Sequence, residues 1–108
     1  MERPLWRESD RELSEIRLKK HFGAKLTETE KTTFKAAEKT LDYFEVYDAT
    51  ESTNRREIFY KMYLDPKSYG RTLLSIAGEV GYDVRSLIMI KKKLLAVFAY
   101  IADKLRRR

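Results

Sequence analysis

The chain has 108 residues, of which 43% are hydrophobic and 37% charged, with 23 Lys and Arg against 17 Asp and Glu. This apolar content suits one modest core and is too high for general disorder, so we expect residues 1–108 to form a single domain. The absence of cysteine excludes a disulfide framework and a thiolate metal site.

The first predicted helix begins at Ser9. Ser9 and Glu12 have the spacing of a capping box, in which both side chains satisfy backbone N–H groups at a helix start. Leu13 and Ile16 are the main apolar positions of this helix, too few for a wide buried face. We therefore expect residues 1–26 to form a helix that is peripheral or is ordered by a partner.

Residues 27–64 form the predicted helical core. A second capping box, from Thr27 to Glu30, opens a helix with four apolar residues at the spacing of one buried face: Phe34, Ala37, Leu41 and Phe44. Polar residues 48–54 connect it to the next helix, which ends before Pro66 because a proline disfavours helical geometry in the residue preceding it. The predicted buried residues of that helix are Ile58, Phe59, Met62 and Tyr63.

Residues 65–108 form the predicted basic part, and residues 73–90 are its most informative stretch. Ala77 is small enough for two helices to cross, Gly81 supplies the positive φ of a tight turn, and Asp83 can cap the next helix. Five apolar residues have core spacing: Ile76, Val80, Val84, Leu87 and Ile90. The arrangement is typical of a helix-turn-helix, although an unrelated helical hairpin with a glycine turn shares some of these features.

The second helix of this motif meets no Gly or Pro before the end of the chain, which predicts one long helix. Residues 94–102 are apolar nearly all round and must be covered. We expect them to pack on the helix of Phe34, Leu41 and Phe44, with a symmetric dimer as the alternative to a monomer. The predicted fold class is therefore all-α: a small helical bundle with a C-terminal helix-turn-helix that ends in a long helix.

The charge excess lies in residues 61–108, which hold eleven basic and four acidic residues. Clustered cations bind DNA by releasing its condensed counterions, so this segment suggests a polyanion-binding face, although charge alone is equally consistent with a solvated, lysine-rich surface. The longest apolar run, residues 94–102, is far shorter than the roughly 20 residues of a membrane span. Residues 1–11 lack the apolar core of a signal peptide, so we expect a cytoplasmic protein without membrane contact.

The predicted DNA-binding residues come from both helices of the motif and the lysine run that follows. Arg85, Ser86 and Lys92 are expected to face DNA from the outer side of the second helix. A further group is expected to act through charge on phosphates: Lys91, Lys93, Lys104 and Arg106 to Arg108. The predicted site consists of Arg71, Ser75, Arg85, Ser86, Ile88, Met89, Lys91, Lys92 and Lys93.

Four stretches carry a family resemblance: 56–64 (REIFYKMYL), 76–82 (IAGEVGY), 83–86 (DVRS), and 90–93 (IKKK) before an apolar helix. From about Phe34 onward the chain resembles phage-encoded late transcription regulators of the RinA and ArpU type. Their C-terminal helix-turn-helix is similar to the fourth region of sigma factors. The resemblance implies a transcription regulator that binds double-stranded DNA inside a bacterial host cell.

The chain departs from this family in two places. Ile88 and Met89 stand where members typically carry polar or aromatic residues against base edges. Apolar side chains there touch thymine methyl groups but make no bidentate hydrogen bonds, which favours weak sequence specificity or a protein-docking role. The link over residues 65–72 is also longer than usual in the family.

No enzymatic, metal or cofactor site is expected, because the chain has one histidine, no cysteine and no catalytic loop signature. His21 is predicted to be a surface residue at a helix end. Two functions remain open. One is a double-stranded-DNA-binding transcription regulator, and the other is a helical interaction protein that docks on RNA polymerase or a phage packaging assembly.

Overall fold

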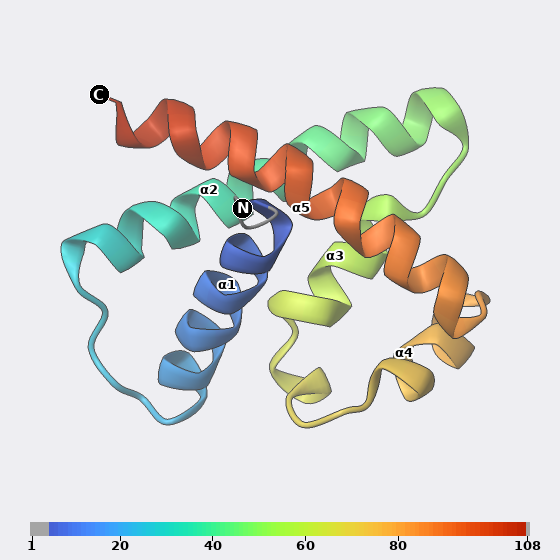
Figure 1. The fold of residues 1–108 in the computed structure, drawn as a ribbon, viewed down its shortest axis with the longest axis horizontal. Helices are drawn as coiled ribbons and strands as arrows, with labels where there is room; N and C mark the ends of the chain where they lie inside the picture. Colours follow the sequence, from blue (N-terminus) through green and yellow to red (C-terminus); the bar gives the residue numbers. More distant parts are fainter. Residues whose placement is uncertain (1–4, 108) are drawn as a thin grey trace.

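The computed structural model describes residues 5–107, which form five α-helices, one short 3-10 helix and no strand (Figure 1). The all-α prediction is confirmed. None of the helices in this range is both long and apolar enough to cross a membrane. In chain order the elements are α1 (Leu5–His21), α2 (Glu28–Glu51), α3 (Arg55–Tyr63), η1 (Pro66–Ser68), α4 (Leu73–Val80) and α5 (Val84–Arg106).

Helix α5 runs diagonally through the whole molecule in Figure 1 and contacts each of the other four α-helices. Its most extensive partner is α2, which agrees with the predicted packing of this helix on α2. Phe59 of α3 joins the two, since its ring centroid lies 6.4 Å from that of Phe44 on α2 and 6.4 Å from that of Phe98 on α5. All three rings are buried, and each contributes about 1.5–3 kcal/mol of hydrophobic stabilisation.

The buried face of α2 differs from the predicted one. Ala37 and Phe44 are buried as expected, but Phe34 and Leu41 are half-buried, and Thr33, Ala36 and Thr40 take their places in the core. Small residues allow neighbouring helices to approach closely, and a buried threonine is tolerated when its hydroxyl is satisfied. The Thr40 hydroxyl donates to the Ala36 carbonyl at 2.7 Å. A prediction of the buried face from apolar residues alone therefore left out this threonine.

Helix α1 is part of the core, which makes the predicted peripheral position wrong. It begins at Leu5, so Ser9 is a buried residue inside the helix and not its cap. Leu13 and Ile16 are both buried, and the helix packs on α2, α3 and α5. Trp6 also packs against the core, and polar side chains complete the contact.

Asp10 and Arg17 provide these polar contacts. The Tyr63 hydroxyl donates to Asp10 Oδ1 at 2.6 Å, and Arg17 donates to the carbonyls of Met62 at 2.6 Å and Asp65 at 3.1 Å. Burial, followed by the hydrogen bond to Asp10, raises the pKa of the Tyr63 phenol far above its usual range. The phenol therefore stays a neutral donor and holds α1 against the end of α3.

The junction between α2 and α3 is shorter than predicted. Helix α2 continues to Glu51 and ends at Ser52, which adopts a left-handed φ of 55°. Asp48, expected in a polar connection, lies in α2 and accepts hydrogen bonds from the backbone N–H groups of Arg55 at 2.8 Å and Arg56 at 2.9 Å. Asp48 therefore caps α3 from the preceding helix, which leaves the side chain of Asn54 available for another contact.

Candidate nucleic-acid interface

Local hydrogen bonds fix the boundaries of α4 and α5. Thr72 caps α4, because its hydroxyl oxygen accepts from the Ser75 N–H at 3.1 Å. Gly81 ends α4 with a φ of 83°, and Asp83 caps α5 by accepting from the Ser86 N–H at 2.7 Å. The predicted positive φ at Gly81 and the predicted cap at Asp83 are both confirmed; the helix-turn-helix as a DNA-reading unit stays a prediction.

The space between α4 and α5 is filled by the residues that the sequence assigned to it. Ala77 is buried, and its carbonyl accepts hydrogen bonds from the N–H groups of Gly81 and, at 3.0 Å, Tyr82. Because Ala77 has a small side chain and its carbonyl accepts two hydrogen bonds from the turn, the chain can reverse direction within a few residues. Of the five predicted apolar positions, only Val84 is half-buried, and the buried ones are Ile76, Val80, Leu87 and Ile90.

The Asn54 side chain joins the α4–α5 turn to the start of α3 by hydrogen bonds. Its Nδ2 donates to the Val80 carbonyl at 3.4 Å, and the Tyr82 hydroxyl donates to its Oδ1 at 3.3 Å. The turn is thereby held from a part of the chain that precedes it by more than 20 residues. Through this contact the orientation of the α4–α5 pair depends on α3.

A small charged cluster surrounds Glu79 of α4. Glu79 accepts a hydrogen bond from Lys61 at 2.8 Å and another from Arg71, and these two contacts hold the pKa of its carboxyl below the ordinary value. Arg71 also donates to the Ser75 hydroxyl at 2.7 and 3.2 Å. The structure therefore brings Arg71 and Ser75 together on the exposed side of α4, with the charge of Arg71 partly compensated.

An exposed stripe on α5 gathers most of the remaining predicted residues. Arg85, Met89 and Lys92 follow one another at intervals of four and three residues, which places them on one face of the helix. Met89 is 63% exposed, and Ile88 beside it is 37% exposed. We call this surface the outer face of α5 and define it by Arg85, Ser86, Ile88, Met89, Lys92 and Lys93.

Lys91 does not belong to the outer face. Its side chain is half-buried, and its Nζ lies 3.3 Å from Asp10 Oδ1 on α1. Each helical residue turns by about 100°, so three consecutive lysines cannot all lie on one face of the helix. Of the three lysines, Lys92 and Lys93 are exposed, whereas Lys91 is used for packing.

The basic end of α5 is also separate from the outer face. Arg106 contacts Glu12 and donates to the Thr33 hydroxyl at 2.9 Å, which ties α5 to both α1 and α2. Lys104 lies over the Tyr100 ring at 4.5 Å, and Arg107 pairs with Asp103 at 3.0 Å. These residues lie about 30 Å along the helix from Arg85, given its rise of about 1.5 Å per residue. The predicted phosphate contact of Arg108 lies outside the described residues.

Two residues beside the outer face were missed by the sequence analysis. The Nζ of Lys92 lies 5.2 Å from the centroid of the Trp6 ring, and the Arg7 guanidinium lies 5.4 Å from the same ring. The first turn of α1 therefore adds an aromatic side chain and a cation next to α5. The available signal was Trp6 itself, a large apolar residue upstream of the assumed helix cap.

His21 is exposed at the end of α1, as predicted, and its ring stacks on Tyr69 with centroids 3.8 Å apart. Within residues 5–107 no group of three or more His, Asp or Glu is placed to hold a metal ion.

No family model, curated protein or solved structure matches this chain.

Proposed function

We propose that the protein is a transcription regulator of the phage late-regulator type, and that α4, the Gly81 turn and α5 act as a helix-turn-helix on double-stranded DNA. The observation that carries the proposal is the charge of α5. Its outer face presents Arg85, Lys92 and Lys93 to solvent, and the helix has no acidic residue before Asp103. A cationic, solvent-exposed helix face of this kind suits a polyanion.

In the proposed complex the first half of α5 lies in the major groove, which admits one α-helix. Arg85 lies in the first turn, where the second helix of such motifs meets base edges. Lys92 and Lys93 lie two turns further on and reach phosphates, which position the helix without reading sequence. Ile88 and Met89 offer thymine methyl contacts, so the preference between sequences is modest.

The proposal places the protein in the cytoplasm of a bacterial host, with RNA polymerase as a second partner, as the family resemblance implies. Arg71 and Ser75 at the start of α4 lie where the first helix of such a motif approaches the DNA backbone. The spacing of the operator indicates how many copies bind, because a dimer requires two half-sites about 34–36 Å apart.

The test is a titration of labelled duplex DNA with the purified protein, followed by fluorescence anisotropy at low salt, with a single strand of the same sequence as control. We expect saturable binding that favours the duplex and weakens steeply as salt rises, because each phosphate that is bound adds about 0.9 to the slope of log affinity against log salt. Selection from a random duplex pool then identifies the preferred sequences. Equal affinity for single strand and duplex would contradict a groove-reading helix.

A second function is favoured by one observation, the exposure of apolar side chains on α4 and α5. Leu74 is 71% exposed, and Ile88 and Met89 are exposed as well, which is typical of a protein-docking surface. In this alternative the chain docks on RNA polymerase or a phage packaging assembly. Replacing Leu74 and Met89 by serine would then abolish capture by that partner, whereas non-specific duplex binding through the lysines would be unchanged.

A further inference from the structure

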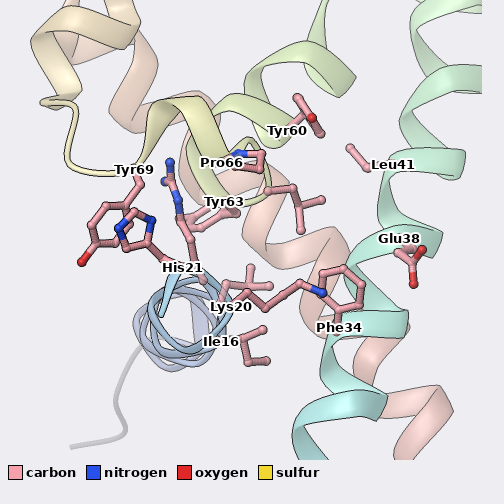
Figure 2. A pocket seen from close by; sticks show the side chains of 13 residues that line it. Ile16, Lys20, His21, Phe34, Glu38, Leu41, Tyr60, Tyr63, Pro66 and Tyr69 are labelled. Carbon is pink, nitrogen blue, oxygen red and sulfur yellow. The ribbon is translucent and has the colours of Figure 1, made fainter. Parts of the chain in front are cut away.

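A cavity of about 330 Å³ lies between α1, α2, α3 and η1, on residues that the DNA proposal does not use (Figure 2). Leu13, Ile16 and Tyr63 line it and are buried. Phe34 and Leu41 of α2 line it as well and are half-buried. This volume lies at the lower end of the range of small-molecule pockets.

The cavity explains why Phe34 and Leu41 are not part of the core. Both residues have the spacing of a buried helix face, yet they border an open space and keep part of their apolar surface in water. Burying apolar surface stabilises a complex in proportion to its area. An occupant with an apolar body would therefore gain affinity from these two side chains.

The charged residues around the cavity are mainly cationic. Arg17 and Lys20 come from the last turns of α1, whereas Glu38 is the one carboxylate among the lining residues. The Lys20 Nζ lies 3.8 Å from the centroid of the Phe34 ring, so a cation and the apolar wall adjoin, and Figure 2 shows Lys20 reaching toward that ring.

Arg17 forms part of the cavity wall. Its two terminal nitrogens donate to backbone carbonyls, but its Nε is buried and has no hydrogen-bond partner within the described residues. Because Nε is buried, an oxygen atom in the cavity cannot contact it, so Arg17 contributes its positive charge and not a hydrogen bond to the cavity wall.

From these features we propose that the cavity binds a small monocarboxylate with an apolar body, of the size of a medium-chain fatty acid. The apolar body packs between Phe34 and Leu41, and the carboxylate accepts a hydrogen bond from Lys20 and is attracted by the positive charge of Arg17. This site does not rest on the proposed DNA-binding function, and either proposal can fail without the other.

The experiment uses octanoate as the probe and octylammonium as a probe of equal chain length and opposite charge, both titrated into the full chain by calorimetry. We expect octanoate to bind at one site and octylammonium to bind at least about tenfold more weakly, a difference of about 1.4 kcal/mol. Equal binding of the two probes, or binding of neither, would overturn the proposal.

Variants then locate the bound octanoate. Lys20→Gln should weaken binding about tenfold, which is the loss of one charge-assisted hydrogen bond, and Leu41→Trp should abolish binding by filling the cavity. Lys39→Gln removes an exposed lysine outside the cavity lining and should leave binding unchanged. Melting curves check that each variant is folded. Two results would contradict the site. One is a Lys20→Gln variant that binds octanoate as tightly as the parent. The other is a Lys39→Gln variant that loses as much octanoate affinity as Lys20→Gln, which would assign the binding to general surface charge.

Discussion

Lys91 and Asp10 form an ion pair, with Nζ and Oδ1 3.3 Å apart, that joins α5 to α1. Asp10 also accepts the hydrogen bond of the Tyr63 hydroxyl, so a single carboxylate links α1, α3 and α5. A lysine at the start of a three-lysine run is thus a packing residue, while Lys93, two positions later, is exposed on the helix surface.

We predict that Lys91→Gln lowers the stability of the fold, whereas Lys93→Gln lowers the affinity for DNA. Lys91→Gln should destabilise the fold by about 1 kcal/mol, because it breaks a partly buried ion pair, and should change DNA affinity little. Lys93→Gln should leave the melting temperature unchanged and weaken DNA binding. Thermal melts and duplex titrations of the two variants provide the check, and a Lys91→Gln protein that melts like the parent but binds DNA more weakly would return Lys91 to the DNA surface.

The Gly81 turn yields a prediction that separates backbone strain from crowding. A Cβ at Gly81 would meet no atom within 4 Å, so the cost of a substitution comes from the φ of 83° alone. Gly81→Ala should destabilise the protein by about 1–2 kcal/mol, whereas Gly81→Asn should cost less, because asparagine tolerates left-handed geometry. Equal melting temperatures for the parent and Gly81→Ala would contradict the assigned turn.

Ala77 tests the crossing of α4 and α5 by a different route. Ala77→Leu inserts a larger side chain into a buried position and should cost about 1–3 kcal/mol through overpacking. Ala77→Ser, which hardly changes the volume, is the matched control. Chemical denaturation of both variants measures the difference, and a fully tolerated leucine would mean that the two helices do not pack closely.

Phe98 tests whether α2, α3 and α5 form one cooperative unit. The ring is fully buried beside Phe59, so Phe98→Ala should destabilise the protein by about 3–5 kcal/mol. The same melts, repeated over a hundredfold range of protein concentration, also report on oligomeric state. A midpoint that rises with concentration, together with a dimeric mass by light scattering, would indicate that part of the α5 surface is covered by a second copy.

The ion pairs of Glu79 lead us to expect that the protein loses stability in acid. The folded state lowers the pKa of its carboxyl through Lys61 and Arg71, so the stabilisation is present above the ordinary value of 4.5 and is lost as the pH falls through the lower folded value. Glu79→Gln should therefore lose less stability than the parent on acidification below about 4.5. Melts across a pH series measure this, with Glu45→Gln, an exposed carboxylate of α2, as the matched control.

The elements that the sequence predicted well are those fixed by local chemistry. The capping box at Thr27 and Glu30, the positive φ of Gly81 and the cap at Asp83 each depend on a few neighbouring residues, and all three are present. Within residues 73–90 the apolar spacing also identified four buried side chains and one half-buried one, Val84, because two helices joined by a short turn have little freedom in how they pack.

The predictions that failed depend on contacts between distant segments. Ser9 has the pattern of a cap, but Leu13 and Ile16 pack on the core together with polar contacts from Asp10 and Arg17, whose partners lie far along the chain. No periodicity within a single helix contains that information. The exposure of Phe34 has the same origin, since a cavity between four elements is a property of their arrangement.

The measurement that tests the central claim most directly is the salt dependence of duplex binding by the triple variant Arg85→Gln/Lys92→Gln/Lys93→Gln. A second variant, Lys35→Gln/Lys39→Gln, removes two exposed lysines of α2 and serves as the control. If the outer face of α5 binds DNA, the triple variant should bind more weakly, and the steepness of its log–log salt dependence should fall by about 0.9 for each phosphate that it no longer neutralises, while the control changes little. A triple variant with the affinity and salt slope of the parent would contradict the assignment of DNA binding to α5.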